Sequence, residues 1–542
     1  MLRFRFFCLP LLAALLAASA APAWAQFVRP FHQPSPRIEP IRGLQGYVRD
    51  GKLHLRLRDY LELVLANDTN IHLAQLSVPA AEAGVVAARA PFDPAFTAAF
   101  GGTRTVAPQY SQISGAQTLD SLAQNGSVGF QASLPSGQSF QIGFSSNRSS
   151  TNSAFAYFNP SFATGLSFSL GMPLLQNRGF LLQNAPIQQA RIALLVTTDQ
   201  TDAQVANLLV SAADQYWSTV QARDSITVRQ QALDLAQKQY QRDEHALQLG
   251  ALPKEDIYQD QTQIATDQVQ VLQAQASYQQ QLDQFRRLIG ADLDAATRDL
   301  DIVLEDDPAA LPAAPNLPPV NDAIAEALRQ RPELRAAERQ TAEDDLGVRM
   351  AHNALLPSLN LTGSYGAAGL GGDQIPVSSS LGSGPAAFVP GGFGDSIRQL
   401  FGFGYPYYGF SLQFTLPVRN SANTAHLANS LLAVKRDRYN ERQQRQQIIQ
   451  DVRLADTQVR MAAEEVKSAT LARDLAEKNV AAEQQKYQLG TTTIFELLQA
   501  QVQLSQTQET LLNANVGYQE AWIAYQRADW TLLSSLRLVI TH

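Results

Sequence analysis

The sequence contains very little cysteine and comparatively little charge. Cys8 is the only cysteine among 542 residues, and charged residues make up 17% of the chain, against about 25% in a typical soluble protein. Apolar residues reach 45%, which disfavours an intrinsically disordered chain. A basic surface is also lacking, because 42 Lys and Arg residues stand against 49 Asp and Glu residues. The composition therefore argues against a disulfide-rich fold and against a nucleic-acid-binding protein.

Long apolar runs are absent beyond the first 25 residues, so the chain lacks the run of about 20 apolar residues that a membrane-spanning helix needs. The first 25 residues have the pattern of an export signal. Arg3 and Arg5 give this segment a positive start, residues 6–20 are apolar, and the Ala-Trp-Ala sequence at 23–25 provides a cleavage site. Cys8 lies inside the apolar stretch. We therefore predict an exported mature chain that has no cysteine and no lipid anchor on a cysteine.

Motifs for catalysis, metals and cofactors are also missing. The seven histidines are scattered through the chain without the HExxH spacing of a zinc site. The sequence contains neither a GxxxxGK[ST] phosphate-binding loop nor a GxSxG nucleophile motif. Two groups of neighbouring acids fall within helical stretches, where we interpret them as solvated surface: Glu343, Asp344 and Asp345, and Glu464 and Glu465. We predict that the protein is not an enzyme, holds no metal and no cofactor, and takes any energy it needs from partner proteins.

The sequence contains an internal repeat. Residues 61–102 align with residues 324–365, and residues 248–256 align with residues 488–496. Two matches in the same order indicate a duplicated unit. The predicted parts are a signal peptide at 1–25, an N-terminal extension at 26–58, a first repeat at 59–319 and a second repeat at 320–542.

Each repeat begins with alternating apolar and polar residues, the pattern of β-strands with one apolar face. This pattern covers about residues 95–170 in the first repeat and about 357–417 in the second. The residues between the apolar ones are polar rather than charged, as in a membrane barrel with a wet lumen. Within the second stretch, residues 366–409 are rich in Gly, Ser and Pro, and we predict an outer loop there. Its aromatic end is expected near the membrane surface and contains Phe401, Phe403, Tyr405, Tyr407 and Tyr408.

The first repeat contains four alternating stretches, with a tight turn predicted at Pro135-Ser136-Gly137. This turn creates an extra hairpin near residues 126–150. The hairpin either joins the sheet or lengthens an outer loop, and the sequence is compatible with both arrangements.

Each repeat continues into very long helices, at about 182–290 in the first and about 420–532 in the second. At 1.5 Å per residue, the stretch at about 182–248 alone would be roughly 100 Å long. Apolar residues are thinly spread along these helices, so we expect them to pack side by side along their length. Shorter helices at about 68–90 and 333–355 complete the return paths, and the Pro- and acid-rich segment 291–319 forms an equatorial connector.

This order of strands, long helical hairpins and duplication resembles the TolC-like outer-membrane efflux proteins. The most specific motif is the hairpin tip from Tyr487 to Leu498, YQLGTTTIFELL, together with its sister at Leu249-Gly250. Arg331-Pro332-Glu333-Leu334, before the return helix, is also similar to the family. The resemblance implies an α+β membrane protein with a duplicated unit of strands and long helical hairpins. It forms a trimeric β-barrel that a periplasmic α-helical barrel continues.

The resemblance also implies the function, the partners and the location. The family provides the outer-membrane channel of tripartite efflux or type I secretion systems in Gram-negative bacteria. The channel is a passive homotrimeric duct in outer-membrane lipid that extends into the periplasm, and a periplasmic adaptor and an inner-membrane pump open its tip. The alternative is a periplasmic or surface coiled-coil structural protein or adhesin, which explains the helices but leaves the strands without purpose. The sequence names neither the cargo nor the energy source of the pump.

The family places a gate at the inner end of the tunnel. By position, Tyr487 corresponds to the gating tyrosine, Asp256 to the acid of the first hairpin and Glu496 to the acid of the second. Thr492 stands where the best-known member has arginine, and Gln499 stands where it has a second acid ring. We therefore predict a gate that relies on hydrogen bonds and packing, whereas the alternative is the ordinary polarity of helix ends. The residues expected to contact the adaptor are Leu249, Gly250, Leu489 and Gly490.

Overall fold

The computed structural model describes residues 35–38, 40–110, 116–249, 254–310, 317–374 and 389–540. The predicted signal peptide and Gly250 lie outside these residues. The chain divides into two compact units, each assembled from three segments. The first unit comprises Met1–Pro79, Leu208–Pro312 and Glu464–Glu520, and the second comprises Ala80–Asn207, Ala313–Ala463 and Ala521–His542.

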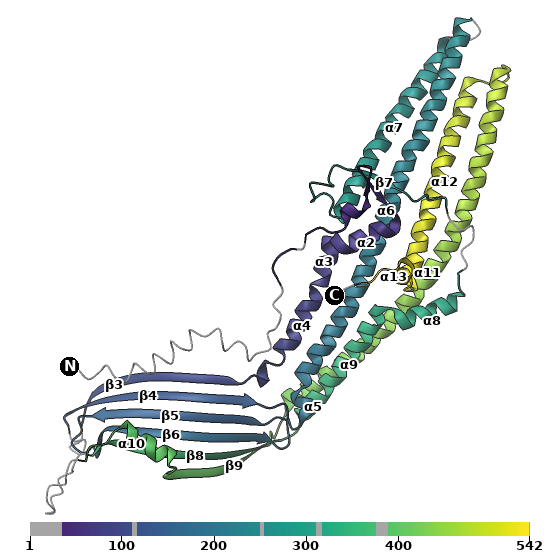
Figure 1. Cartoon of the computed structure of the whole chain (residues 1–542). Coiled ribbons are helices and arrows are strands. Elements are labelled where there is room, and N and C mark those ends of the chain that lie inside the picture. The colour runs from purple at the N-terminus through teal and green to yellow at the C-terminus, as the bar shows by residue number, and fades with distance from the viewer. Residues whose placement is uncertain are drawn as a thin grey trace, which may run out of the picture. The chain divides into compact units, whose positions relative to one another are not determined.

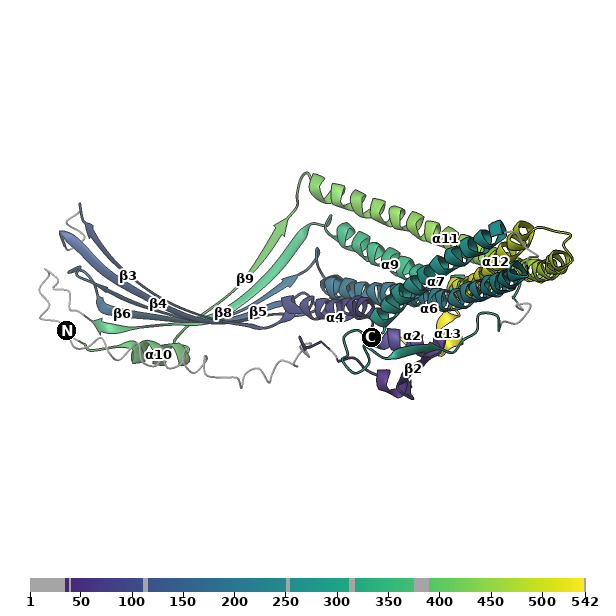
Figure 2. The ribbon, with the colours of Figure 1, turned by 90° about the horizontal axis from the view of Figure 1, so that it is seen from above.

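The second unit contains a six-stranded antiparallel sheet, labelled in Figure 1. Its strands are β3 (Ala95–Pro108), β4 (Thr118–Ser133), β5 (Ser139–Thr151), β6 (Phe158–Pro173), β8 (Ser358–Gln374) and β9 (Tyr405–Thr415). They pair in this order, so β3 and β9 are the edges of the sheet, which is curved (Figure 2). The extra hairpin, β4 and β5, pairs with β3 on one side and β6 on the other. Of the two arrangements left open by the sequence, the hairpin joins the sheet.

The register of the sheet separates an apolar face from a polar face. Residues directly opposite one another on neighbouring strands share a face. One such row contains Phe96, Phe130, Ile142, Phe168, Tyr365 and Tyr408. The adjacent row on the other face contains Thr97, Gly129, Gly143, Ser167 and Gly366, and it ends with Tyr407 on the edge strand β9. The apolar face is open, since Phe96 is 71% exposed and Phe410 is 84% exposed.

Part of the predicted outer loop at 366–409 is regular structure, which corrects that prediction. Strand β8 continues to Gln374, helix α10 covers Phe393–Phe401, and β9 begins at Tyr405. Helix α10 packs against β6 and β8, where the Thr164 hydroxyl donates to the carbonyl oxygen of Ser396 at 3.2 Å. At Gly369 and Gly371 a Cβ atom would overlap the backbone of α10. The glycines that we interpreted as a loop therefore make room for a helix against a strand.

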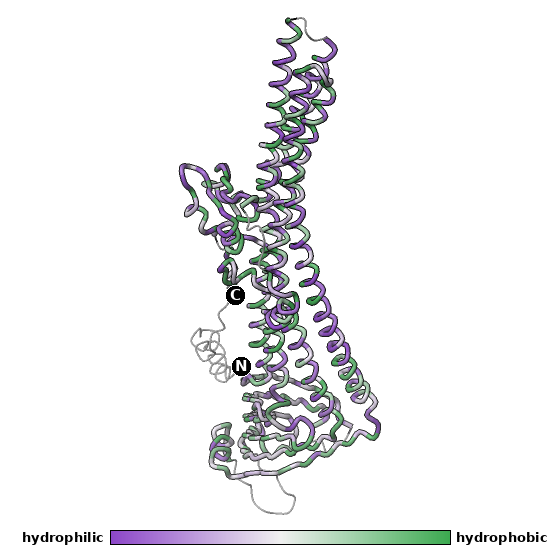
Figure 3. The backbone as a smooth tube through the Cα atoms, turned by 90° about the vertical axis from the view of Figure 1, so that its right-hand side faces the viewer, coloured by the Kyte–Doolittle hydropathy of each residue, from purple (hydrophilic) through white to green (hydrophobic). Residues whose placement is uncertain are grey.

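Long helices follow the strands and reach from one unit into the other. Their limits lie close to the predicted ranges: α6 is Ala185–Gln248, α7 is Lys254–Leu288, α11 is Ser421–Gln488 and α12 is Ile494–Ala528. The shorter α-helices are α2 (Leu57–Asn67), α3 (Thr69–Gln75), α4 (Ser77–Ala87), α5 (Phe180–Gln183), α8 (Val320–Gln330), α9 (Pro332–Asn353) and α13 (Leu532–Leu536), and two 3-10 turns are η2 (Leu44–Tyr47) and η3 (Ala90–Phe92). Hydrophobic and hydrophilic residues alternate along the long helices instead of forming one apolar block (Figure 3).

The first unit has an aromatic core between α2, α6 and α7. The ring of Tyr60 lies 4.1 Å from that of Phe285 and 5.6 Å from that of Tyr216. The Tyr216 hydroxyl donates to Asp306 at 2.8 Å, and the same carboxylate oxygen accepts from the backbone N–H of Leu57 at 2.7 Å. A small sheet lies in the same unit, in the order β1 (Val48–Arg49), β2 (Lys52–Leu55), β7 (Asp301–Leu304). It ties the predicted N-terminal extension to the predicted connector.

Replacing Gly369 with alanine should displace α10 from the sheet. The added methyl group would meet the carbonyl oxygen of Ser396 and would lie 2.8 Å from the Thr164 hydroxyl. Overpacking of this kind costs about 1–3 kcal/mol, so hydrogen exchange of residues 393–401 should become roughly ten times faster or more. The matched control is Gly363→Ala, because nothing lies within 4 Å of a Cβ there. Equal exchange in both variants would show that α10 does not depend on this contact.

Candidate functional site: the hairpin tips

The first unit contains two helical hairpins, α6 with α7 and α11 with α12, and the second hairpin ends in a tight reversal. Helix α11 ends at Gln488, and Gly490 follows in the left-handed conformation at φ +73°. The N–H of Gly490 donates to the carbonyl of Tyr487 at 2.9 Å, and Thr491 donates to Lys486 at 3.0 Å, so the last carbonyls of the helix are capped. Leu489 is 78% exposed, and Leu249, at the end of α6, is 72% exposed. A leucine is thus exposed to solvent directly after α6 and another directly after α11.

Tyr487 joins the two hairpins. Its ring is half-buried against an apolar cluster at the start of α12, made of Ile494, Leu497 and Leu498. Its hydroxyl donates to the carboxylate of Asp243 on α6 at 3.1 Å. Burial, and then the nearby Asp243 carboxylate, raise the pKa of the Tyr487 hydroxyl above its usual value. The tyrosine therefore stays protonated and acts as a hydrogen-bond donor between α11 and α6.

Asp243 belongs to a buried acidic cluster. It is 3% exposed, and it also accepts a hydrogen bond from Gln239 at 2.8 Å. Asp260 on α7 is 1% exposed, and in the described part of the chain no donor group reaches its carboxylate oxygens. Burial, and then Asp243 and Asp256, raise the pKa of Asp260 to about 7. Near neutral pH the Asp260 carboxyl therefore carries a proton part of the time, and that proton can be donated to Asp243.

The structure brings together two of the five predicted gate residues. Tyr487 and Asp256 both face the acidic cluster. Glu496 is exposed in the first turn of α12, Gln499 is exposed one turn later, and Thr492 is partly exposed in the reversal. Among the described residues, none of these three has a side-chain hydrogen bond to the cluster.

Sequence reasoning missed Asp243 and Asp260. A usable signal was present on α7, where Asp256, Asp260, Gln263 and Asp267 recur every three or four residues and so share one face of the helix.

The polar contacts continue along the hairpins above the tips. Gln263 donates to Asp267 at 2.9 Å, and Arg229 on α6 donates to Gln270 on α7 at 2.7 Å. Arg229 also lies 3.5 Å from the carboxylate of Glu509 on α12. These helices are therefore held together by polar groups that water can replace, and such an interface separates more readily than an apolar one.

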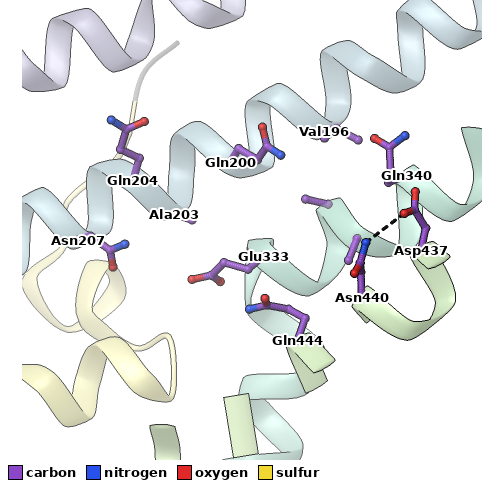
Figure 4. A pocket seen from close by; sticks show the side chains of 12 residues that line it. Val196, Gln200, Ala203, Gln204, Asn207, Glu333, Gln340, Asp437, Asn440 and Gln444 are labelled. Atoms are coloured by element: carbon purple, nitrogen blue, oxygen red, sulfur yellow. Dashed lines mark hydrogen bonds between the residues drawn. The ribbon is translucent and has the colours of Figure 1, made fainter. Parts of the chain in front are cut away.

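The second unit contains a polar groove of about 470 Å³ between α6, α9 and α11 (Figure 4). Asp437 accepts a hydrogen bond from Asn440 at 3.1 Å within it. Glu333 lines one end and forms ion pairs with Arg331 and Arg527. The remaining polar side chains of the lining are mainly carboxamides, those of Gln200, Gln204, Asn207, Gln340 and Gln444. Polar side chains therefore also line the interface between these helices in the second unit.

The described residues contain no group of three or more His, Cys, Asp or Glu side chains placed to hold a metal ion. By length and composition, one described helical stretch, Thr69–Phe92, could cross a membrane. This stretch is interrupted between α3 and α4, and only 17% of its apolar 18-residue segment is buried.

Comparisons with known proteins identify relatives of this architecture. Residues 323–529 match the family model described as outer membrane efflux protein. The fold is similar to that of CusC, described as forming a transmembrane channel, with a TM-score of 0.62 and 18% identity over 93% of this chain and 99% of that one. For the CmeC outer membrane channel of Campylobacter jejuni, the TM-score is 0.60 and the identity 14%, over 88% of this chain and 86% of that one. For the open state of the MtrE outer membrane channel of Neisseria gonorrhoeae, the TM-score is 0.59 and the identity 18%, over 88% of this chain and 89% of that one. No curated protein sequence matches the chain.

These similarities confirm the predicted α+β fold class and the predicted resemblance to the TolC-like outer-membrane efflux proteins. The family match also confirms the predicted class of function, an outer-membrane efflux channel, and it does not favour a coiled-coil structural protein or adhesin. The family is a class of channels and not of enzymes.

The tip should loosen as the pH rises. A carboxyl whose pKa is raised in the closed tip binds its proton more tightly there than in the open tip. The closed tip is therefore most stable below about pH 4 and loses stability as the pH rises through about 7. Each pKa unit corresponds to about tenfold in the opening equilibrium. Hydrogen exchange of residues 254–262, corrected for intrinsic rates, should accelerate at least tenfold between pH 5 and pH 8.

Asp260→Asn should abolish this acceleration, since the amide does not titrate. Asp234→Asn is the control, because Asp234 is an exposed acid on α6. If Asp260→Asn kept the pH dependence of the wild-type chain, another group would have to be its source.

Tyr487→Phe should favour the open tip, because it removes the hydrogen bond to Asp243 and leaves the packing in place. One such bond contributes about 0.5–1.5 kcal/mol, so the open fraction should rise roughly two- to tenfold in single-channel recordings. Tyr487→Ala should raise the conductance further, since it also uncovers the apolar cluster at Ile494. The control is Tyr258→Phe, at a tyrosine that is 64% exposed. If Tyr487→Phe gave the same currents as the wild-type chain, the hydrogen bond between Tyr487 and Asp243 would have no part in the gate.

Proposed function

We propose that this chain, whose residues 323–529 match the family model described as outer membrane efflux protein, is a passive homotrimeric channel in the outer membrane of a Gram-negative bacterium. One observation carries the proposal: a six-stranded sheet with one open apolar face, one polar face and two free edges leads directly into long polar helices. The apolar face suits lipid, and the polar face suits a water-filled lumen.

Trimerisation follows from the edges of the sheet. An open sheet in lipid leaves backbone N–H and C=O groups unpaired, at several kcal/mol each. Copies of the chain would pair β9 of one protomer with β3 of the next and close the barrel. The exposed helical stretch Thr69–Phe92 supports this arrangement, because it is rich in alanine and needs a neighbour.

The hairpin tips suit contact with a periplasmic adaptor and an inner-membrane pump. Leu249 and Leu489 are exposed at the reversals, and Gly490 shapes one of them; Gly250, beyond the described residues, stays in this proposal as their counterpart. The gate would consist of Tyr487 and Asp256 with the buried acids behind them. Glu496, Thr492 and Gln499 stay in the proposal as polar residues of the neighbouring turn, to which an adaptor has access. The duct needs no energy source of its own when a pump supplies it.

The direct test is to extract the chain from membranes with detergent, measure its mass, and insert it into planar bilayers. We expect a trimer that dissociates only on heating in dodecyl sulfate and that gives discrete conductance steps. A monomer that remains soluble without detergent and carries no current would contradict the proposal. Addition of an adaptor should increase the conductance in the wild-type chain and should have less effect in Leu489→Glu.

A further inference from the structure

The apolar face of the sheet changes character toward the strand ends that lie away from the long helices. On the same face, three rows beyond the row of Phe96, the residues directly opposite one another are Gly102, Gln124, Arg148, Phe162 and Gly371. The next row pairs Arg104 with Leu122. By register, both arginines therefore stand on the same face as the apolar rows, and neither points to the polar face.

The apolar rows fill most of one bilayer core. From Leu359 to Ala367, β8 advances eight residues, roughly 26 Å along the strand. At the usual tilt of about 40° this corresponds to roughly 20 Å of height, against about 25 Å for the apolar band of a membrane barrel. The next row is mixed and contains Phe100, Ser146 and Thr164. Arg148 and Arg104 follow immediately beyond it. With the helices in the periplasm, as proposed above, these arginines stand at the headgroups of the outer leaflet.

The local contacts hold Arg148 in place without neutralising it. Its guanidinium donates to the Gln124 carboxamide at 2.9 Å and lies 5.9 Å from the centre of the Phe162 ring. That ring packs edge-on against Phe393 of α10, with their centres 6.0 Å apart. In the described part of the chain, no carboxylate pairs with Arg148. The side chain is therefore a fixed positive charge at the level of lipid headgroups.

Two further arginines lie at the same end of the sheet. Arg104 is 66% exposed and donates through Nε to Asp120 at 2.9 Å. Arg398 projects from α10, is 83% exposed, and lies 3.5 Å from Asp395. Asp373, at the same end of β8, adds a third aspartate, and its carboxylate accepts from the backbone N–H of Gly391 at 3.1 Å. Arginines and aspartates are therefore equal in number here, and among the described residues Arg148 is the arginine of the three without a carboxylate partner. The planar fork of a guanidinium suits the oxygens of a phosphate group.

We propose that Arg148, supported by Arg104 and Arg398, binds the phosphate of an anionic glycolipid in the outer leaflet. Helix α10 lies beside this site on the apolar face and offers Phe393 and Phe401 to the acyl chains. The site would fix the depth of the barrel in the membrane and would anchor α10. This inference rests on the proposed membrane location, and its test separates the two.

The experiment uses the trimer in nanodiscs that contain a bisphosphorylated lipid A or its dephosphorylated form, with bound lipid counted by native mass spectrometry. We expect the phosphorylated lipid to remain bound to the wild-type chain and the dephosphorylated lipid to be lost. Arg148→Gln should lower the bound fraction about tenfold, and Arg148→Lys should lower it less. The matched control is Arg419→Gln, because Arg419 is an exposed arginine at the opposite end of the sheet.

Each outcome has a definite meaning. Equal retention in Arg148→Gln and wild type, with normal trimers and conductance, overturns this inference and leaves the proposed channel intact. Displacement of the lipid by millimolar inorganic phosphate would indicate a free-phosphate site and would also overturn the assignment to a lipid. Failure of the wild-type chain to form channels would contradict the proposed function itself.

Discussion

Strands β3 and β9 leave their outer backbone groups unpaired at the two edges of a sheet whose apolar face is exposed. In lipid, such groups have no water to bind, and each costs several kcal/mol. The sheet is therefore incomplete within one chain, and pairing between copies removes both edges at once. Strands from both predicted repeats contribute to the same sheet.

The helices meet a different requirement. In the proposed channel they must pack together while the tip is closed and separate when it opens. Carboxyl pairs recur between them. Burial and Asp214 raise the pKa of Glu520 to about 7 between α12 and α6, and burial and Asp437 raise the pKa of Asp344 to about 6 between α9 and α11. Together with Asp260 beside Asp243, these pairs hold best when one carboxyl is protonated. Helix packing in this protein therefore depends on protonation and hydration as well as on apolar burial.

The features that the sequence predicted are those carried by neighbouring residues. The alternation of Phe96, Ala98 and Phe100 marks a strand, and long stretches without proline mark the helices, because both periodicities appear within a few turns. The limits of α6, α7, α11 and α12 accordingly fall within a few residues of the predicted ones. Gly490 was recognisable in the same way, since its left-handed conformation follows from its place at a helix end.

The features that sequence reasoning missed depend on distant partners. Tyr487 bonds to Asp243, 244 residues away, and nothing near either residue indicates the other. The glycines of β8 suggest a loop when the sequence is considered alone. They are needed because α10 approaches the strand closely, and the sequence pattern does not indicate that helix. The pairing of β2 with β7 likewise joins segments some 250 residues apart.

The central claim is that the sheet closes between copies of the chain through β9 and β3. Thr97 on β3 and Ser411 on β9 both lie on the polar face by register. The most direct measurement replaces both residues with cysteine, as Thr97→Cys and Ser411→Cys in one chain. A short bismaleimide is then used to crosslink this double variant in native membranes. The account predicts a covalent ladder that ends at the trimer, and each single variant should give at most a dimer. Crosslinks confined to the monomer, or a ladder that runs past the trimer, would contradict it.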